Sequence, residues 1–314
     1  MVHSTDLESL RSTRAREFES RLLRQEMALP TINVDIKSET VSKAIGLIAK
    51  AGYVLYEPYR IKKKATAESE AKIISTKTEI RISSLQRQAL NRILSTETLR
   101  QENINNLTGK ALNEIVSNGK QIDNATDVDW IKKYFGFSQD ISNDEMQDIW
   151  SKILSGELTK SGSFSYKTMA ILANMRKEEA ALFSVVCQYV IRVGQRLVPL
   201  IYEDVGDKID SGYNEGTLSF ENLQFLQSLG LIHFNEVGEY ILSSPSKGIV
   251  VGCSEKKFLI SSEVDGKNVL KVGKVFLTKE GQELCTIINE KSSLNLPEII
   301  KNRLVTENKT IKEL

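Results

Sequence analysis

The stretch SNDEMQDIWSKILSGELTKSGSFSYKTMAILANM, from Ser142 to Met175, carries the clearest helical signal of the chain. Its apolar side chains recur three and four residues apart, the spacing of one face of an amphipathic helix. That face consists of Met146, Ile149, Trp150, Ile153 and Leu154. Ser142 followed by Glu145 has the spacing of a capping box, and Gly156 is the expected end of the helix. The stretch therefore predicts a helical domain.

Two more helices should follow this one. The first is expected to begin at Ser163 or Ser165, because serine is a common N-cap residue, and the second at about Lys177. Together these segments predict a helical middle domain over residues 121–198. Trp150 lies at helical spacing, which favours a core position over a base-stacking site. We expect the two tryptophans of the chain to form the centre of this domain.

The segment SGSFS, from Ser161 to Ser165, has a second interpretation. A serine-rich turn that opens a helix offers free N–H groups, which can bind phosphate. The segment lacks the G-x-x-x-x-G-K-[ST] form of a phosphate loop, and serine is the ordinary residue for capping a helix. Helix capping is therefore the expected role.

Upstream, four isoleucines recur eleven residues apart, at Ile82, Ile93, Ile104 and Ile115. Eleven residues make three helical turns, so the row forms an apolar stripe that runs almost straight along a helix. A continuous stripe of this kind demands a partner helix. The predicted oligomer seam consists of Ile82, Leu85, Ile93, Ile104 and Leu107.

This seam defines a long-helix assembly region over residues 37–120. A long helix from about Arg60 to about Glu97, followed by a shorter one, is the preferred arrangement, and a helical hairpin would also fit. Residues 1–36 are expected to form an N-terminal helix and a linker, because Pro30 ends the first helical pattern.

The segment AIGLIAKAGYVLYEPYRIKKK, from Ala44 to Lys64, joins an apolar helix to a basic cluster. An amphipathic helix beside lysines can bind an anionic membrane surface. The same residues can instead pack in a core or against a second subunit, and the two glycines of the helix favour this close packing. The candidate membrane or partner contacts are Ile45, Ile48, Lys62, Lys63 and Lys64.

The C-terminal part, residues 199–292, is predicted to be a small α+β domain. A helix over SFENLQFLQSLG, short strands separated by turn residues, and a helix capped by Thr278 resemble a winged-helix arrangement. The helix over SFENLQFLQSLG contains no Lys or Arg, which weakens the case for base readout. The candidate nucleic-acid contacts are Lys256, Lys257, Lys271 and Lys274. Residues 293–314 are expected to be a polar, frayed tail.

Composition excludes several classes of protein. The formal net charge is +1 over 314 residues, so a dedicated nucleic-acid binder is not indicated. Three scattered cysteines and two histidines do not form the common zinc spacings and fit a reducing cytoplasm. No apolar run of about 20 residues is present, so we expect a soluble, cytoplasmic protein that could lie at the periphery of the inner membrane.

A catalytic constellation is also absent from the sequence patterns. His233 lies in a predicted strand with no Ser or Cys elbow near it, which favours a structural histidine. We therefore predict no catalytic residues, no cofactor site and no metal site.

Four segments give the chain a family resemblance: YEPYRIKKKATAESEAK, DVDWIKKYF, the block from Ser142 to Phe183, and LTKEGQEL. The chain resembles an uncharacterised family of bacterial proteins catalogued as a domain of unknown function, DUF2806. The resemblance covers about Lys37 to Asn289, and its most specific part is the block from Trp150 to Ser165. A similar block occurs in families linked by gene neighbourhood to abortive infection. The resemblance implies a bacterial cytoplasmic context and a role in antiviral defence, and it carries over no catalytic residues.

These observations favour a non-enzymatic, self-assembling interaction, scaffold or sensor protein. We expect a homo-oligomer, with a protein partner encoded nearby. Two alternatives stay open: a winged-helix regulator that binds nucleic acid, and an effector directed to the membrane surface.

Overall fold

A computed structural model describes residues 39–53, 84–202, 218–244, 248–253, 256–262, 268–289, 304 and 309–314. These residues form eight helices and nine strands, so the chain is mainly α with a small β part, as predicted. The helices are α2 (Glu39–Lys50), α4 (Ser84–Ser117), α5 (Val128–Ser138), α6 (Asp144–Thr159), α7 (Tyr166–Asn174), α8 (Lys177–Gln188), α9 (Phe220–Ser228) and α10 (Lys279–Asn289). The strands are β1 (Val190–Val193), β2 (Arg196–Pro199), β3 (Ile232–Phe234), β4 (Tyr240–Ser244), β5 (Ile249–Cys253), β6 (Lys256–Ser262), β7 (Asn268–Gly273), β8 (Val275–Leu277) and β9 (Lys309–Glu313).

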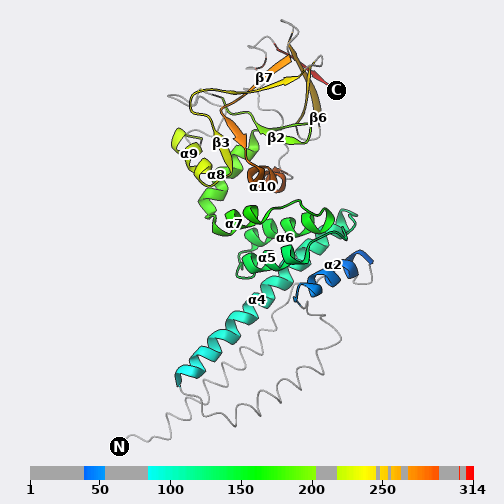
Figure 1. The fold of residues 1–314 in the computed structure, drawn as a ribbon, viewed down its shortest axis with the longest axis vertical. Helices are drawn as coiled ribbons and strands as arrows, with labels where there is room; N and C mark the ends of the chain where they lie inside the picture. Colours follow the sequence, from blue (N-terminus) through cyan, green and yellow to red (C-terminus); the bar gives the residue numbers. More distant parts are fainter. Residues whose placement is uncertain are drawn as a thin grey trace, which may run out of the picture.

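The described parts are arranged along one long axis (Figure 1). A helical body made of α2, the C-terminal half of α4, α5, α6 and α7 lies in the middle. The N-terminal half of α4 projects from one end of this body, and the α/β part with its strands lies at the other end. The helix α10 belongs to the α/β part by its contacts with β2 and β8, and it also contacts α6 and α7.

The predicted tryptophan-centred core is confirmed. Trp150 and Tyr134 are fully buried, and the Tyr134 hydroxyl donates to the Trp150 carbonyl oxygen over 2.9 Å. Trp130 is also buried, and its Nε1 donates to the Phe164 carbonyl oxygen over 2.7 Å. Because a buried polar group costs free energy unless it is hydrogen-bonded, these bonds fix α5 against α6 and the loop that follows it.

The two ends predicted for the central helix are wrong. Asn143, not Ser142, is the N-cap of α6, and its side-chain oxygen accepts from the Met146 amide over 3.0 Å. The helix also continues past Gly156 to Thr159. A Cβ atom on Gly156 would lie 2.6 Å from Cε2 of Phe164, so this glycine makes room for the ring instead of ending the helix. The N-cap at Ser165 is confirmed, and α8 begins at Lys177 as predicted.

The helix α4 is continuous over 34 residues, so the predicted break near Glu97 is wrong. The part of the predicted long helix before Ser84 lies outside the described residues. A buried amide network ties the C-terminal half of α4 to the helical body. Asn103 Nδ2 donates to the Gln139 carbonyl oxygen over 2.9 Å, and Gln147 Nε2 donates to Asn103 Oδ1 over 3.2 Å.

The α/β part contains a five-stranded antiparallel sheet in the order β2-β1-β5-β6-β9. Two further pairs, β3 with β8 and β4 with β7, are also antiparallel. The predicted helical middle domain extends to residue 198, but β1 within it pairs with β5 in the main sheet, so the α/β part begins earlier than predicted. The predicted frayed tail is also corrected at 309–313, because β9 forms the edge strand beside β6.

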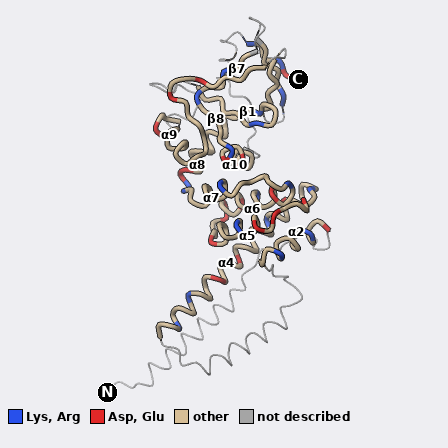
Figure 2. Tube along the Cα trace, in the orientation of Figure 1, with Lys and Arg blue, Asp and Glu red and all other residues tan. Residues whose placement is uncertain are grey.

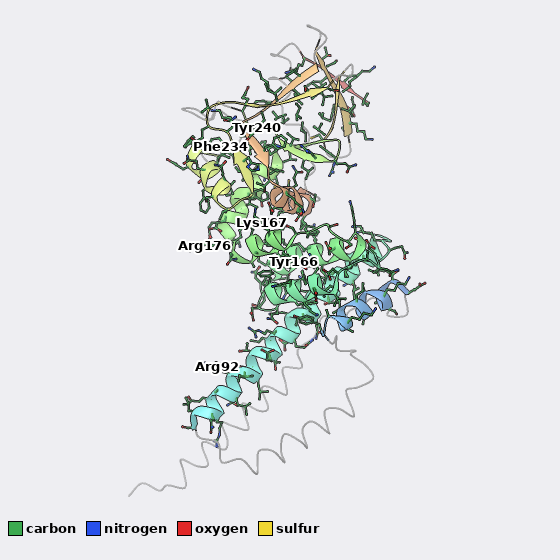
Figure 3. The ribbon with its side chains drawn as sticks, in the orientation of Figure 1. Arg92, Tyr166, Lys167, Arg176, Phe234 and Tyr240 are labelled. Atoms are coloured by element: carbon green, nitrogen blue, oxygen red, sulfur yellow. The ribbon has the colours of Figure 1, made fainter. Side chains whose placement is uncertain are left out.

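The motif LTKEGQEL docks α10 onto its neighbours. Thr278 Oγ1 caps α10 by accepting from the Gly281 amide over 3.0 Å, as predicted. A Cβ atom on Gly281 would lie 2.0 Å from the Leu231 carbonyl oxygen, so only glycine allows this close approach. The Gln282 side chain forms paired hydrogen bonds with the backbone of Leu197 in β2, of 2.8 Å and 2.6 Å. On the helical side, Lys167 of α7, labelled in Figure 3, lies 3.4 Å from Glu280 of α10.

All three cysteines are buried, which predicts low thiol reactivity. Burial raises the pKa of the Cys187 thiol well above its ordinary value, and the neighbouring Cys285 raises it further. Since the thiolate is the reactive form, we expect the folded protein to react with Ellman's reagent far more slowly than free cysteine does. In the unfolded protein, all three thiols should react with the reagent. Rapid reaction of Cys187 in the folded protein would contradict this expectation.

Candidate functional site

Four backbone amides in the loop after α6 are bound by carboxylates of the protein itself. The Ser161 amide donates to Asp123 Oδ2 over 2.9 Å. The amides of Gly162 and Phe164 donate to the two oxygens of Glu157, over 2.7 Å and 3.0 Å. The Ser165 amide donates to Glu283 Oε2 over 2.7 Å, and Thr168 Oγ1 donates to the same oxygen.

These carboxylates decide between the two interpretations of SGSFS. Because the amides that could bind a phosphate are already bound to Asp123, Glu157 and Glu283, the loop is a structural turn. The amides of Ser161 and Ala125 lower the pKa of Asp123. Burial raises the pKa of Glu157, and the amides of Gly162 and Phe164 oppose that shift. We call this loop, with Asp123, Glu157 and Glu283, the carboxylate joint, because it links α6, α7 and α10.

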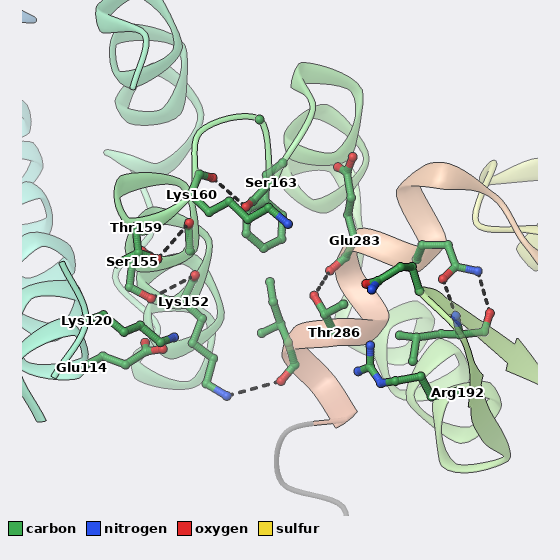
Figure 4. A pocket seen from close by; sticks show the side chains of 17 residues that line it. Glu114, Lys120, Lys152, Ser155, Thr159, Lys160, Ser163, Arg192, Glu283 and Thr286 are labelled. Carbon is green, nitrogen blue, oxygen red and sulfur yellow. Dashed lines mark hydrogen bonds between the residues drawn. The ribbon is translucent and has the colours of Figure 1, made fainter. Parts of the chain in front are cut away.

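A pocket of about 440 Å³ lies beside this joint, between the helical body and the α/β part (Figure 4). Four cationic side chains from separate segments line it. Lys152 belongs to α6, Lys160 follows α6, Lys120 follows α4, and Arg192 belongs to β1. Figure 4 shows Lys152 and Lys160 extending from the α6 side toward α10. The remaining polar lining includes Ser155, Thr159, Ser163, Gln195, Gln282, Glu283, Thr286 and Glu114.

The predicted oligomer seam is divided by the structure. Ile104 and Leu107 are 4% and 0% exposed within the helical body of the chain itself, so their assignment to a contact between subunits is corrected. Leu85 and Ile93 are 73% and 54% exposed on the projecting half of α4. Ile82 lies outside the described residues.

The predicted membrane or partner contacts in the segment from Ala44 to Lys64 do not share one environment. Ile48 is fully buried in the core, so it is corrected from a candidate surface contact to a packing residue. Ile45 is half-buried and packs against that core. Lys62, Lys63 and Lys64 lie outside the described residues. None of the helices in the described part of the chain is both long enough and apolar enough to span a bilayer.

The four lysines proposed for nucleic-acid contact do not share one environment. Lys256 pairs with Glu313 at 3.0 Å, and Lys271 lies 3.7 Å from Glu239. Lys257 is exposed on β6. Lys274 is corrected to a buried residue, and its Nζ donates to the Glu236 carbonyl oxygen over 3.1 Å. Figure 2 shows basic and acidic residues interspersed along the described trace.

His233 lies in β3, as predicted, with an exposed side chain. Among the residues that the structure describes, no group of three or more His, Cys, Asp or Glu side chains is placed to hold a metal ion.

The pocket and its carboxylate joint were not identified from sequence. Glu157 and Glu283 stand inside SGEL and LTKEGQEL, two of the segments that carry the family resemblance, and this was the available signal. Lys160 also lies inside the block from Trp150 to Ser165, whereas Arg192 lies in none of these segments. Only the docking of α10 against α6, and of β2 against α10, brings them to one pocket.

Comparison with known proteins identifies the family of the chain. A model of the family described as Protein of unknown function (DUF2806) matches residues 86–301, which is more than half of the chain. No curated protein and no solved structure matches it. The matched range extends from α4 through the helical body to the α/β part, and thus includes the carboxylate joint and every residue that lines the pocket. The chain therefore belongs to the DUF2806 family.

Proposed function

We propose that the protein is a non-enzymatic, self-assembling interaction protein whose copies meet along the projecting half of α4. The observation that carries this proposal is a set of large apolar side chains exposed to solvent on that half. These are Leu85, Leu90, Ile93 and Leu94, exposed by 73%, 47%, 54% and 55%.

The exposed residues continue the buried face of the same helix. Ile93 precedes Ile104 by eleven residues, and Leu90 precedes Leu112 by twenty-two, so each pair points to nearly the same side of α4. Ile104 and Leu112 are buried in the helical body, where α6 packs against α4. In the projecting half, the same face also carries large apolar side chains. There, however, they are exposed, because the helical body does not extend over this half.

A second copy of the chain is a suitable partner for this face. Residues 84–100 extend over about 25 Å of helix, and an isolated helix of that length is marginally stable in water. Burying each large aliphatic side chain contributes about 1.5–3 kcal/mol. Two such faces are self-complementary because both are apolar, and their pairing would stabilise the projecting helices together. The proposed seam is therefore narrowed to Leu90, Ile93 and Leu94, which lie within about 100° of one another round α4. Leu85 points about 180° away from Leu94 and lies outside the seam.

Light scattering coupled to gel filtration tests the proposal. We expect a homo-oligomer at micromolar concentration, and we expect the double variant Leu90→Glu, Ile93→Glu to be a folded monomer, because buried unpaired charge opposes association. Circular dichroism would establish that the variant is folded. Leu99→Glu is the matched control, since Leu99 is also exposed, at 58%, but points about 120° away from Ile93 round the helix. A strictly monomeric wild-type chain would contradict the proposal.

The biological setting of this assembly is also a proposal. The family resemblance supports a bacterial cytoplasmic protein of antiviral defence, with a partner encoded nearby. A test is to delete the gene in its host and challenge the cells with phage. Unchanged survival across a broad phage panel would remove the defence role.

A winged-helix-like regulator is the second candidate function. Its support is α9 followed by β3, the pairing of β3 with β8, and the following α10. The exposed Lys257 supplies charge, but α9 offers no Lys or Arg. Salt-sensitive binding of duplex DNA that is lost in Lys257→Gln would support this function. Support for the membrane-directed alternative is limited to the composition of 44–64.

A further inference from the structure

We infer that the pocket between α6, α10 and β1 binds a phosphorylated small molecule of nucleotide size. This binding site goes beyond the proposed assembly, and it uses residues at the opposite end of the helical body from the projecting half of α4 (Figures 1 and 4).

Uncompensated positive charge is the first observation that carries this inference. Lys120, Lys160 and Arg192 line the pocket, and none of them forms an ion pair or a side-chain hydrogen bond with the described residues. Lys152 donates to the Ile287 carbonyl oxygen over 3.3 Å, and it is not counted among these unpaired cations. A concave surface with a net positive charge raises the local concentration of anionic ligands.

The acidic residues of the pocket leave this excess in place. Glu283 is bound by the Ser165 amide and by Thr168, and its other oxygen lies 3.7 Å from Lys279. Glu114 lies on the same side of the pocket as Lys120 in Figure 4. One carboxylate thus faces the three unpaired cations Lys120, Lys160 and Arg192, while the second is engaged by the carboxylate joint.

The hydroxyl groups of the pocket add a second kind of recognition. Ser155, Thr159 and Ser163 each donate their proton to a backbone carbonyl oxygen, over 3.1 Å, 2.8 Å and 2.6 Å. A hydroxyl that donates in this way keeps its lone pairs as acceptors. These oxygens can accept from the hydroxyl groups of a sugar, whereas the cations can only donate, to phosphate oxygens.

The size of the pocket fits the same class of ligand. Its volume of about 440 Å³ lies within the range typical of small-molecule sites. Phe164, Leu197 and Ile287 supply apolar lining. Cations, hydroxyl acceptors and apolar surface together match a phosphorylated sugar that carries a base. Inorganic phosphate alone would need only the cations.

Such a ligand would connect two parts of the chain. Lys120, Lys152 and Lys160 belong to the helical body, whereas Arg192 belongs to β1 of the main sheet. A ligand held by both sides would stabilise their docking, because a ligand that binds only the folded state raises the free energy of unfolding.

Isothermal titration calorimetry with ATP, inorganic tripolyphosphate and adenosine tests the inference, and thermal unfolding provides a second readout. We expect ATP and tripolyphosphate to bind and raise the unfolding temperature, and adenosine to do neither. Arg192→Gln should weaken ATP binding about tenfold or more, because a hydrogen bond to a charged group is lost. Lys160→Gln is a second variant, on an exposed residue, with the same expectation.

Arg196→Gln is the matched control, because Arg196 is exposed in the same β1–β2 hairpin and does not line the pocket. It should bind ATP as the wild type does. The inference would be overturned if neither phosphate probe bound, or if both Arg192→Gln and Lys160→Gln bound ATP with unchanged affinity. A short DNA duplex that displaced ATP and bound more tightly would overturn it in favour of a nucleic-acid surface.

Discussion

Gly273→Ala is expected to destabilise the folded protein by more than about 4 kcal/mol, beyond the range of most single substitutions. A Cβ atom at this position would lie 1.8 Å from the Ile201 carbonyl oxygen and 3.0 Å from the Tyr202 amide nitrogen. The same carbonyl oxygen accepts a hydrogen bond of 2.8 Å from the Lys274 amide, so the two segments cannot separate without losing it. Gly273 also has a φ of +89°, which L-residues rarely adopt.

Two further glycine variants separate the causes of this effect. Gly194 has a φ of +61° but no atom within 4 Å of an added Cβ, so Gly194→Ala should cost about 1 kcal/mol of conformational strain alone. Gly136 lies in α5, with open space around it, and Gly136→Ala should stabilise the protein by about 0.5–1 kcal/mol. Urea unfolding followed by tryptophan fluorescence measures all three. If Gly273→Ala cost no more than Gly194→Ala, the close approach of residues 201 and 273 would be refuted.

Glu157→Ala is expected to cost about 3 kcal/mol, because it leaves the buried Phe164 amide and the Gly162 amide without their acceptors. Glu157 is 2% exposed, so water does not readily replace its carboxylate. The loop it holds also supplies the carbonyl oxygen that accepts from Trp130. Loss of the carboxylate should therefore loosen the packing of α5 as well.

Glu157→Gln serves as the intermediate variant in this test. Its side chain keeps one acceptor oxygen, so we expect its stability to lie between those of the wild type and Glu157→Ala. The matched control is Glu145→Gln in the same helix, where the exposed pair with Lys177 should contribute no more than about 0.5 kcal/mol. Equal stability of the wild type and Glu157→Ala in urea unfolding would contradict the structural role of this carboxylate.

The pH dependence of the Glu157 contribution has a defined sign. Burial raises the pKa of Glu157 above its ordinary value of 4.5, so the folded chain holds this proton more tightly than the unfolded chain does. The proton-linked stability is fully present below pH 4.5 and is lost as the pH rises through the folded pKa. The stability of the wild type relative to Glu157→Gln should therefore decrease as the pH rises from about 4 to about 7. A constant difference over that interval would argue against the shift.

Sequence patterns predicted those features that depend on neighbouring residues. The helical period of Met146 to Leu154, the N-cap at Ser165 and the cap at Thr278 all occur in the structure. Each depends on side chains within about one or two helical turns, which periodicity and capping preferences describe well. The errors at Ser142 and Gly156 have the same origin. Asn143 competes for the cap, and a ring from a later residue requires the glycine.

The row of isoleucines shows where local patterns are insufficient. An eleven-residue repeat places Ile93 and Ile104 on one face, but it cannot tell which of them meets another part of the same chain. The body formed by α5 and α6 covers Ile104 and ends before Ile93. A single seam between subunits was therefore the simplest prediction. Only its exposed part, on the projecting half of α4, stays a proposal.

The sequence by itself determined the helical middle segment, the helix over SFENLQFLQSLG, the helix capped by Thr278, and the family. These follow from local periodicity, from capping residues and from motifs. Only the tertiary structure decided that Ser165 and Glu283, 118 residues apart, form one hydrogen bond, and that Arg192 faces the pocket of Lys152 and Lys160. The physical reason is that such sites depend on the docking of α10 against α6 and of β2 against α10. That docking is the sum of many contacts between residues far apart in the sequence, and no local sequence pattern encodes it.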